Sequence, residues 1–227
     1  METKLLSDHA EDLLEAAELL RNGAVVGMPT ETVYGLAADA RNPEAVRQIF
    51  AAKGRPADNP LIVHIAEMRA LEQVAATVPP LAEKLAERFW PGPLTMILPK
   101  RKEIPEITSG GLDTVGIRMP SHPVARALIQ LSGVPIAAPS ANISGYPSPT
   151  TAQHVMRDMQ GKIAAVVDGG ACSVGVESTV IALEPNGTVR ILRPGFVTKE
   201  MLEEVAPEVT LDPAILHQLQ EGQTVRS

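Results

Sequence analysis

The sequence has very little of two residue types that define whole classes of protein. A single cysteine, Cys172, stands among 227 residues, so no internal disulfide forms and a reducing, intracellular setting is favoured. Aromatic residues make up only 3%, so the core must be built from Leu, Ile, Val, Ala and Met. The same scarcity argues against a surface that binds single-stranded nucleic acid by base stacking, because stacking needs exposed rings.

Targeting and membrane segments are absent as well. Residues 1–10 are mixed polar and lack the apolar stretch of a signal peptide, and no run of 18 apolar residues follows. We therefore expect a cytoplasmic protein with no membrane partner. The net charge of −7 argues against non-specific coating of nucleic acid, although a local cationic cleft would still bind phosphate groups.

The common catalytic signatures are missing too. The chain contains no G-x-x-x-x-G-K-[ST] phosphate loop, no G-x-G-x-x-G, no G-x-S-x-G and no H-E-x-x-H. Its five histidines are scattered without the spacing of metal ligands, so the sequence predicts no metal site held by the protein. A function must come from some other arrangement of residues.

Apolar runs alternate with helical periodicity along most of the chain, and the 44% hydrophobic content is typical of a globular protein. This pattern predicts an α/β fold with a twisted, mixed sheet and helices on both faces. Asn186-Gly187 predicts a hairpin, which excludes a plain doubly wound sheet. The expected strands are 24–28, 61–65, 94–98, 114–119, 134–138, 163–167, 178–183 and 189–192. The expected helices are 8–20, one starting at 42–43, 68–76, 81–89, 123–131, one capped by Thr150 or Thr151, and 199–205, with 213–220 either a helix or a loose tail.

Two polar loops flank the helix that starts at Asn42. The first holds Thr30, Glu31 and Thr32, whose side chains suit either a ligand site or a turn that satisfies its own backbone. The second holds Lys53 and Arg55 on either side of a glycine. Cations at a helix C-terminus stabilise the macrodipole, but two of them in a proline-rich loop favour contact with a phosphate.

Two more polar loops follow predicted strands later in the chain. Residues 138–149 carry small, hydroxyl and amide side chains, which let backbone N–H groups approach an anion; an ordinary turn-rich connection is the alternative. Residues 175–179 suit a binding loop or simply the entry into a strand.

Three single residues are further candidates. Arg118 lies within a predicted strand, where it either grips a carboxylate or phosphate in bidentate fashion or faces solvent. Arg193, before Pro194-Gly195, has the same alternatives. His64 ends an apolar strand, and on sequence alone a hydrogen-bonded core histidine is favoured over a ligand contact.

These segments, taken in order, resemble the YrdC-like family, the threonylcarbamoyl-AMP synthases, over about residues 8–205. The motifs that carry the resemblance are Pro29–Leu36, Lys53–Pro56, Asn59–Leu61, Trp90–Thr95, Arg118–Pro120, Ala138–Asn142, Gly175–Thr179 and Leu192–Gly195. The resemblance implies a twisted α/β fold with a large concave cavity. It also implies a reaction in which L-threonine, bicarbonate and ATP, used with Mg²⁺, give L-threonylcarbamoyladenylate and pyrophosphate.

The resemblance further implies a role for each matched residue. The residues expected to hold L-threonine and bicarbonate are Thr30, His64, Arg118, Ala138 and Ser178. Those expected to hold ATP are Lys53, Arg55, Asn59, Thr114, Ser140, Asn142, Ser148 and Arg193. Lys53 and Arg55 are also the expected catalytic residues, since phosphoryl chemistry of this kind needs positioning and charge neutralisation rather than a covalent nucleophile. The product would pass to a transferase that modifies the tRNA adenosine beside the anticodon, with transient tRNA contact left open.

The resemblance also predicts how the chain is divided, with a catalytic domain over residues 1–205. Residues 206–227 are expected to form a tail or the start of an interdomain linker, because longer family members continue into a linker and a further domain. Two alternatives remain open: an RNA-binding module of the same fold without catalysis, and a carbamoyl-adenylate domain like those of hydrogenase maturation proteins.

Overall fold

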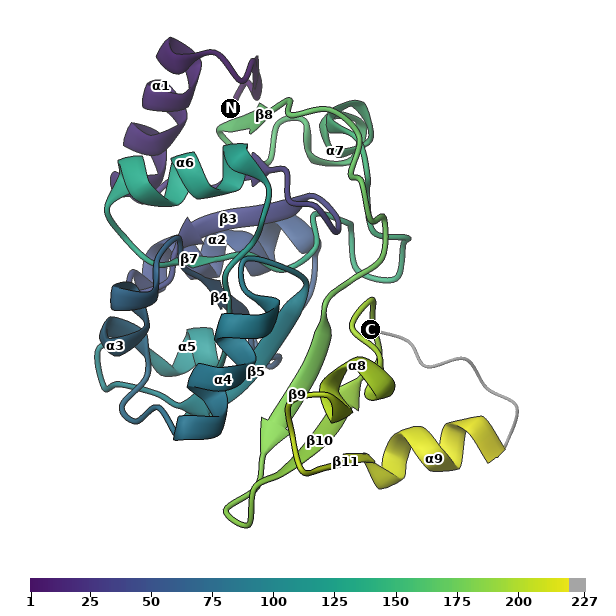
Figure 1. Ribbon diagram of the computed structural model, residues 1–227. Helices are drawn as coiled ribbons and strands as arrows, with labels where there is room; N and C mark the ends of the chain where they lie inside the picture. The colour runs from purple at the N-terminus through teal and green to yellow at the C-terminus, as the bar shows by residue number, and fades with distance from the viewer. Residues whose placement is uncertain (221–227) are drawn as a thin grey trace.

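The computed structural model describes residues 1–220, with side chains up to His217, and within this part of the chain eleven strands form one mixed sheet (Figure 1). The order across it is β1-β8-β2-β3-β7-β4-β6-β5-β9-β10-β11. Parallel pairs such as β4 with β6 occur in the same sheet as antiparallel pairs such as β5 with β6. The strands are β1 (Lys4–Leu6), β2 (Val26–Met28), β3 (Gly35–Asp39), β4 (Ile62–His64), β5 (Leu94–Pro99), β6 (Thr114–Arg118), β7 (Ile136–Ala137), β8 (Ala165–Val167), β9 (Thr179–Leu183), β10 (Thr188–Arg193) and β11 (Glu208–Leu211).

Helices cover both faces of the sheet, as the sequence predicts. One apolar layer joins α1 and α6 to the inward side chains of β2 and β8, and the other joins α2, α3 and α4 to β4, β5 and β6. The helices are α1 (Ala10–Arg21), α2 (Pro43–Lys53), the 3-10 turn η1 (Met68–Ala70), α3 (Leu71–Val74), α4 (Pro80–Phe89), α5 (Glu106–Ser109), α6 (Pro123–Ser132), α7 (Ala152–Met159), α8 (Lys199–Glu203) and α9 (Pro213–Gln220). The α/β fold with a mixed sheet is confirmed.

Helix α2 shows why the predicted boundaries hold where local chemistry is strong. The Asn42 side chain accepts hydrogen bonds from the backbone N–H groups of Glu44 and Ala45, and Pro43 occupies the first helical position. Gly54 ends the helix at φ 69°, a left-handed conformation that glycine adopts without strain. These two caps place Lys53 at the last helical residue and send the chain sharply away from the helix.

Three strands were missed by the sequence interpretation. Residues 35–39, where the sequence predicts no strand, form β3, which pairs with β2 and β7. This segment consists mainly of small apolar residues and contains none of the β-branched and aromatic residues that indicate a strand. β1 and β11 have only three and four residues, and each forms because a parallel neighbour, β8 or β10, is present.

The C-terminal part of the described chain joins the sheet. β9 and β10 form the hairpin predicted from Asn186-Gly187, and β11, which lies beyond the predicted boundary at residue 205, pairs with β10. Residues 213–220 form α9 and not a loose tail, while residues 221–227 of the predicted tail lie outside the described residues. Among residues 1–220, no helix combines the length and apolar character needed to cross a membrane.

Candidate functional site

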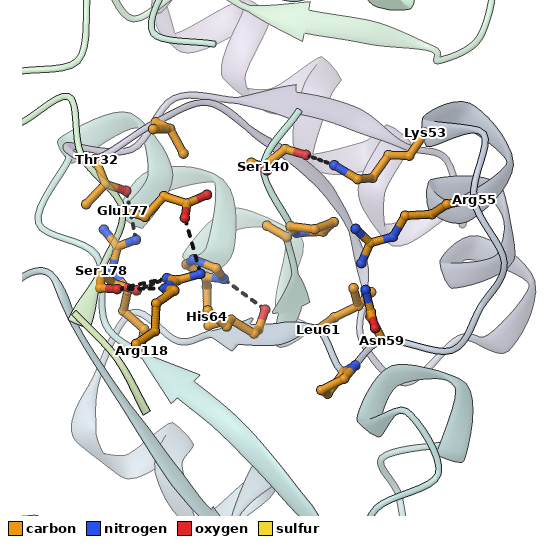
Figure 2. Close-up of a pocket in the computed structure, with 16 residues that line it drawn as sticks. Thr32, Lys53, Arg55, Asn59, Leu61, His64, Arg118, Ser140, Glu177 and Ser178 are labelled. Carbon is orange, nitrogen blue, oxygen red and sulfur yellow. Dashed lines mark hydrogen bonds and ion pairs between the residues drawn. The ribbon is translucent and has the colours of Figure 1, made fainter. Parts of the chain in front are cut away.

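A cavity of about 270 Å³ lies where several strands end in loops (Figure 2). β4 and β6 run parallel, so His64 and Arg118 at their C-terminal ends lie side by side. The segments after α2 and β7 and the loop before β9 complete the wall. The lining residues are Thr32, Val33, Lys53, Arg55, Asn59, Pro60, Leu61, Ile62, His64, Arg118, Ala138, Pro139, Ser140, Glu177, Ser178 and Arg193.

Most of the residues expected from the resemblance meet at this cavity. Nine of them line it: Lys53, Arg55, Asn59, His64, Arg118, Ala138, Ser140, Ser178 and Arg193. The other four, Thr30, Thr114, Asn142 and Ser148, do not. Asn142 contacts the amine of Lys53. Ser148 lines an adjoining hollow of about 300 Å³ that shares Val33, Glu177 and Arg193 with the main cavity. The roles assigned to all of these residues stay predictions.

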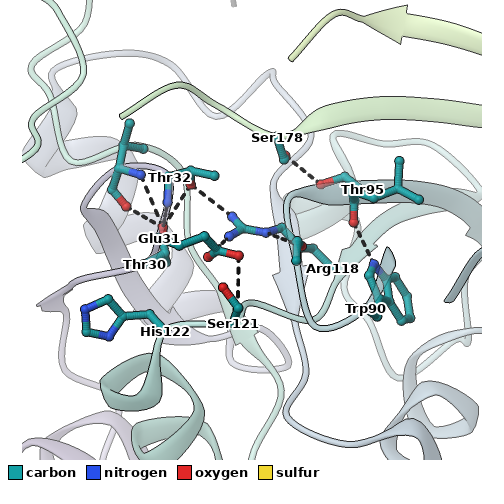
Figure 3. A network of polar contacts seen from close by, with 12 residues as sticks. Thr30, Glu31, Thr32, Trp90, Thr95, Arg118, Ser121, His122 and Ser178 are labelled. Atoms are coloured by element: carbon teal, nitrogen blue, oxygen red, sulfur yellow. Dashed lines mark hydrogen bonds and ion pairs between the residues drawn. The ribbon is translucent and has the colours of Figure 1, made fainter. Parts of the chain in front are cut away.

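Arg118 is bound on several sides by the protein itself (Figure 3). Its guanidinium forms an ion pair with Glu31, and both side chains are buried. Nη1 donates to Oγ1 of Thr32 at 3.1 Å and Nε donates to the carbonyl of Gly92 at 3.3 Å. A guanidinium carries five N–H donors, so these contacts leave two for a ligand. Arg118 therefore has a fixed orientation before any ligand arrives.

His64, beside Arg118, is held in the neutral form. Burial and, to a smaller extent, the positive charge of Arg118 lower the pKa of His64 to about 3, although a hydrogen bond to the Ile62 carbonyl acts in the opposite direction. The Nδ1 atom lies 3.2 Å from that carbonyl. The imidazole therefore offers the cavity a neutral polar edge, and it is a poor proton acceptor.

Ser178 and Arg193 are joined by a compact set of hydrogen bonds. Arg193 donates from Nη2 to the Ser178 carbonyl at 2.8 Å and to its Oγ at 3.1 Å. Nη1 of Arg193 lies 3.4 Å from the carboxylate of Glu177, which also accepts from Ser148 at 3.1 Å. On the side away from the cavity, the buried hydroxyl of Thr95 lies 2.8 Å from that of Ser178. The loop before β9 is thus held rigidly from both sides.

Gly195 makes this arrangement sterically possible. A Cβ atom at that position would lie 2.5 Å from the Glu177 carbonyl oxygen and 2.5 Å from the Thr179 nitrogen. Only glycine lets the chain after Arg193 pass this close to the loop. The match of Leu192–Gly195 to a family motif therefore has a steric reason.

Lys53 lies at the other end of the cavity. Its amine donates to the backbone carbonyls of Ser140 and Asn142, the latter at 2.9 Å, and lies 3.3 Å from the Asn142 side-chain oxygen. Burial and, to a smaller extent, the nearby charge of Arg55 lower the pKa of Lys53 to about 8, although the charge of Glu177 acts in the opposite direction. Lys53 thus holds the loop after β7 in place through hydrogen bonds, and its amine loses its proton at a lower pH than an ordinary lysine.

Arg55, next to Lys53 in Figure 2, has an incomplete set of contacts. Its Nε is buried without a hydrogen-bond partner, and its guanidinium stacks over Phe50 at 5.8 Å. Within residues 1–220, neither Arg55 nor Lys53 forms an ion pair with a carboxylate. Two neighbouring cations without a counterion are suited to a polyanionic ligand such as a triphosphate.

The comparison with known protein families decides the relationship. The family model of the Sua5/YciO/YrdC domain, described as telomere recombination, matches residues 18–195. The chain belongs to this family. The match covers every segment that lines the cavity.

Members of the Sua5/YciO/YrdC family with curated names include close relatives of the chain. The threonylcarbamoyl-AMP synthase of Pyrococcus abyssi is 56% identical over 88% of the chain and 58% of its own length. The threonylcarbamoyl-AMP synthase of Bacillus subtilis is 52% identical over 95% of the chain and 62% of its own length. A crystal structure of P. abyssi Sua5 complexed with L-threonine superimposes with a TM-score of 0.90 at 50% identity, covering 100% of the chain and 66% of that protein. The chain thus spans about three-fifths of the length of the two named synthases.

The family motifs point to Thr30, but the structure places its neighbours closer to the ligand space. The Thr30 hydroxyl donates to the Val33 carbonyl at 2.6 Å and accepts from the backbone N–H of Val33, so it closes a turn. Thr32 is the residue of this turn that lines the cavity, with Glu31 behind Arg118. Glu177 also lines the cavity and was quoted only as part of a loop. The sequence signal that could have indicated a role for Glu31 is an acidic residue among the hydroxyl and apolar residues of its motif.

Within residues 1–220, no group of three His, Cys, Asp or Glu side chains lies close enough together to hold a metal ion. The carboxylate on the cavity wall, Glu177, is engaged with Arg193 and Ser148. The residues present therefore do not fit a resident cation site. A divalent ion that enters with a nucleotide would take its ligands from the phosphate groups.

Proposed function

We propose that the protein is a threonylcarbamoyl-AMP synthase, which converts L-threonine, bicarbonate and ATP into L-threonylcarbamoyladenylate and pyrophosphate. The observation that carries the proposal is the two-ended cavity within a family domain that is more than half identical to named synthases. One end offers Arg118, His64 and Ser178, and the other offers Lys53 and Arg55. We place this reaction in the cytoplasm, with the product passing to a tRNA-modifying transferase.

The amino acid would bind at the Arg118 end. The two remaining N–H groups of Arg118 suit the carboxylate of threonine, because a guanidinium binds a carboxylate with fixed geometry. The structure of P. abyssi Sua5 in complex with L-threonine supports a threonine site in this family. Ser178 and the neutral His64 would contact the rest of the amino acid.

ATP would bind at the Lys53 end, with Mg²⁺ carried on its phosphates. The threonine amine, once deprotonated, attacks the carbon of bicarbonate, and a C–OH bond breaks so that the hydroxyl leaves as water with a proton from the amine. The resulting N-carboxythreonine attacks the α-phosphorus of ATP. The new bond joins a carboxyl oxygen to the α-phosphorus, and the bond from this phosphorus to the bridging oxygen breaks, so pyrophosphate leaves. Lys53 and Arg55 would offset the charge that develops on the phosphates, and the fixed end would hold the nucleophile in line.

The test is a reconstitution with the chain as it stands. Incubation with ATP, labelled bicarbonate, L-threonine and Mg²⁺ is expected to give a labelled adenylate and one equivalent of pyrophosphate. Omitting threonine must abolish both products, and replacing threonine and bicarbonate by carbamoyl phosphate must not restore them. No labelled adenylate above background would refute the proposal for this chain.

A further inference from the structure

The charges around the cavity are distributed unequally. At one end each arginine has its own carboxylate: Arg118 pairs with Glu31, and Arg193 pairs with Glu177. We call these four residues, with the neutral His64, the paired end; its net charge is zero. We call Lys53 and Arg55 the cationic end, because no carboxylate pairs with either of them among the described residues.

Of these four charged groups, Glu31 is the one without direct access to the ligand space. It is 5% exposed and does not line the cavity, whereas Arg118 in front of it does. One carboxylate oxygen of Glu31 accepts from Arg118, and the other accepts from the backbone N–H of Ser121 at 3.0 Å. Figure 3 shows the carboxylate held between these two donors. Glu31 is therefore a fixed negative charge behind the arginine that faces the ligand.

This placement has an electrostatic consequence for any ligand carboxylate. An anion bound to Arg118 would leave the buried paired end with a net charge of −1, and an uncompensated charge in a buried site is costly. A zwitterion brings its own ammonium group and leaves the net charge at zero. His64 cannot supply the missing proton, since its pKa is far below neutral.

We propose that Glu31 makes the paired end select a zwitterionic amino acid over an anion of the same shape. Glu31 acts through Arg118 and is a specificity-determining residue that never touches the ligand. The inference rests on the proposed function, in which this end holds L-threonine. Anions without an ammonium group, such as hydroxy acids and phosphates, are directed instead to Lys53 and Arg55.

A pair of matched ligands tests the inference. L-Threonine and its hydroxy-acid analogue, 2,3-dihydroxybutyrate of the same stereochemistry, have nearly the same shape but differ by one charge. Calorimetric titration of the unaltered protein is expected to show the hydroxy acid binding at least about ten-fold more weakly, because it leaves an uncompensated negative charge in the buried paired end. Glu31→Gln is expected to shift this ratio by at least about ten-fold toward the hydroxy acid.

Two further variants separate charge from geometry. Glu31→Asp keeps the charge and moves it by one methylene, so the ratio is expected to stay within about three-fold of the unaltered protein. Glu204→Gln makes the same chemical change in an exposed ion pair with Arg88 and is expected to change nothing. Thermal melting and ATP titration of each variant check that the fold and the cationic end are intact.

Each outcome is decisive. Equal binding of the two ligands by the unaltered protein, or an unchanged ratio in Glu31→Gln, overturns the inference and leaves the threonine site standing. A shifted ratio in Glu31→Asp also overturns it, since geometry and not charge would then decide. Binding of neither ligand by the unaltered protein overturns the proposed function itself. If Glu31→Gln does not fold, equal binding of the two ligands by the unaltered protein, or a shifted ratio in Glu31→Asp, still overturns the inference.

Discussion

The two ends of the cavity differ in whether the protein supplies a carboxylate partner for each cation. At the paired end, Arg118 and Arg193 have carboxylate partners and several hydrogen bonds each. At the cationic end, Arg55 has a buried Nε without a partner, and Lys53 has a pKa lowered to about 8. The arginines of the paired end are neutralised by carboxylates without any ligand. Among the described residues, the two cations of the cationic end have no carboxylate partner.

This difference indicates how the site divides its work. Pre-organised, paired groups hold a small ligand in a fixed place, because no rearrangement is needed when it binds. Neighbouring cations without a carboxylate partner destabilise the free protein, and a bound anion removes this cost. Such destabilising charges are typical of functional sites. The contrast therefore predicts opposite effects of substitutions on stability and on binding at the two ends.

The largest effect is expected on stability when a paired arginine is removed. Arg118→Met leaves Glu31 as a buried charge without a partner, which costs about 3–5 kcal/mol of the free energy of unfolding. Arg55→Met leaves no such carboxylate and is expected to change stability by less than about 0.5 kcal/mol. Urea denaturation of the two variants makes the comparison.

A double variant checks the cause of that loss. Arg118→Met combined with Glu31→Gln removes both charges and is expected to recover most of the lost stability, since the penalty arises from the unpaired charge. Equal stability losses for Arg118→Met and Arg55→Met would contradict the distinction between the two ends.

The next effect concerns nucleotide binding at the cationic end. Lys53→Ala is expected to weaken ATP binding by roughly 100-fold, since it removes a positive charge at the phosphate end of the cavity together with the contacts that hold the loop after β7. Threonine affinity is expected to stay within about two-fold, because Lys53 makes no contact with the paired end. Separate calorimetric titrations with ATP and threonine measure both.

The control for Lys53→Ala lies on the same helix. Arg47 is exposed on α2 and pairs with Glu44, so Arg47→Ala removes one cation without touching the cavity and should leave ATP binding unchanged. Equal loss of ATP and threonine binding in Lys53→Ala would show that the cavity is one undivided site.

Much of this arrangement could be predicted from the sequence, because the strongest local signals coincide with the site. The Asn42 cap and Gly54 determine the position of Lys53, and the apolar run 61–65 correctly predicts a buried strand there, although β4 covers only Ile62–His64. Polar loops after buried strands correctly indicated where a cavity would lie. The fold class followed from the alternation of these elements.

The partners within the site could not be predicted in the same way. Glu31 and Arg118 are 87 residues apart, and their ion pair depends on β4 and β6 lying parallel beside the turn at Thr30. The same holds for Thr95 and Ser178, which meet only because β5 pairs with β9. β3 was missed because a run of Leu and Ala becomes a strand only between two existing neighbours.

A smaller effect is expected from pH on ATP binding at the cationic end. Lys53 is protonated below its pKa of about 8, so its positive charge is present at pH 7 and mostly lost at pH 9. ATP affinity is therefore expected to fall by up to about ten-fold between these values, while the phosphates of ATP, whose last pKa is about 6, keep their charge.

A lysine-to-arginine change tests the origin of this pH dependence. Lys53→Arg keeps its charge across the range, so whatever its absolute affinity for ATP, the decline between pH 7 and pH 9 is expected to disappear. A decline that persists in Lys53→Arg would assign the titration to another group.

The smallest effect is expected from Thr95, which supports the paired end from behind. Thr95→Val removes the hydroxyl that lies 2.8 Å from Ser178, so stability is expected to fall by about 0.5–1.5 kcal/mol. The Ser178 hydroxyl keeps its hydrogen bond from Arg193, so its position becomes less well defined but is not lost. The KM for threonine is therefore expected to rise about three-fold, with the KM for ATP unchanged.

Thr108→Val supplies the matched control for this small change. Its hydroxyl is equally buried and donates to the Ala40 carbonyl at 2.7 Å, away from the cavity, so it should lose similar stability with no change in either KM. If Thr95→Val behaved in the same way, the Thr95 hydroxyl would be a purely structural contact. A rise in the KM for threonine alone would instead extend the paired end to a residue that no ligand can reach.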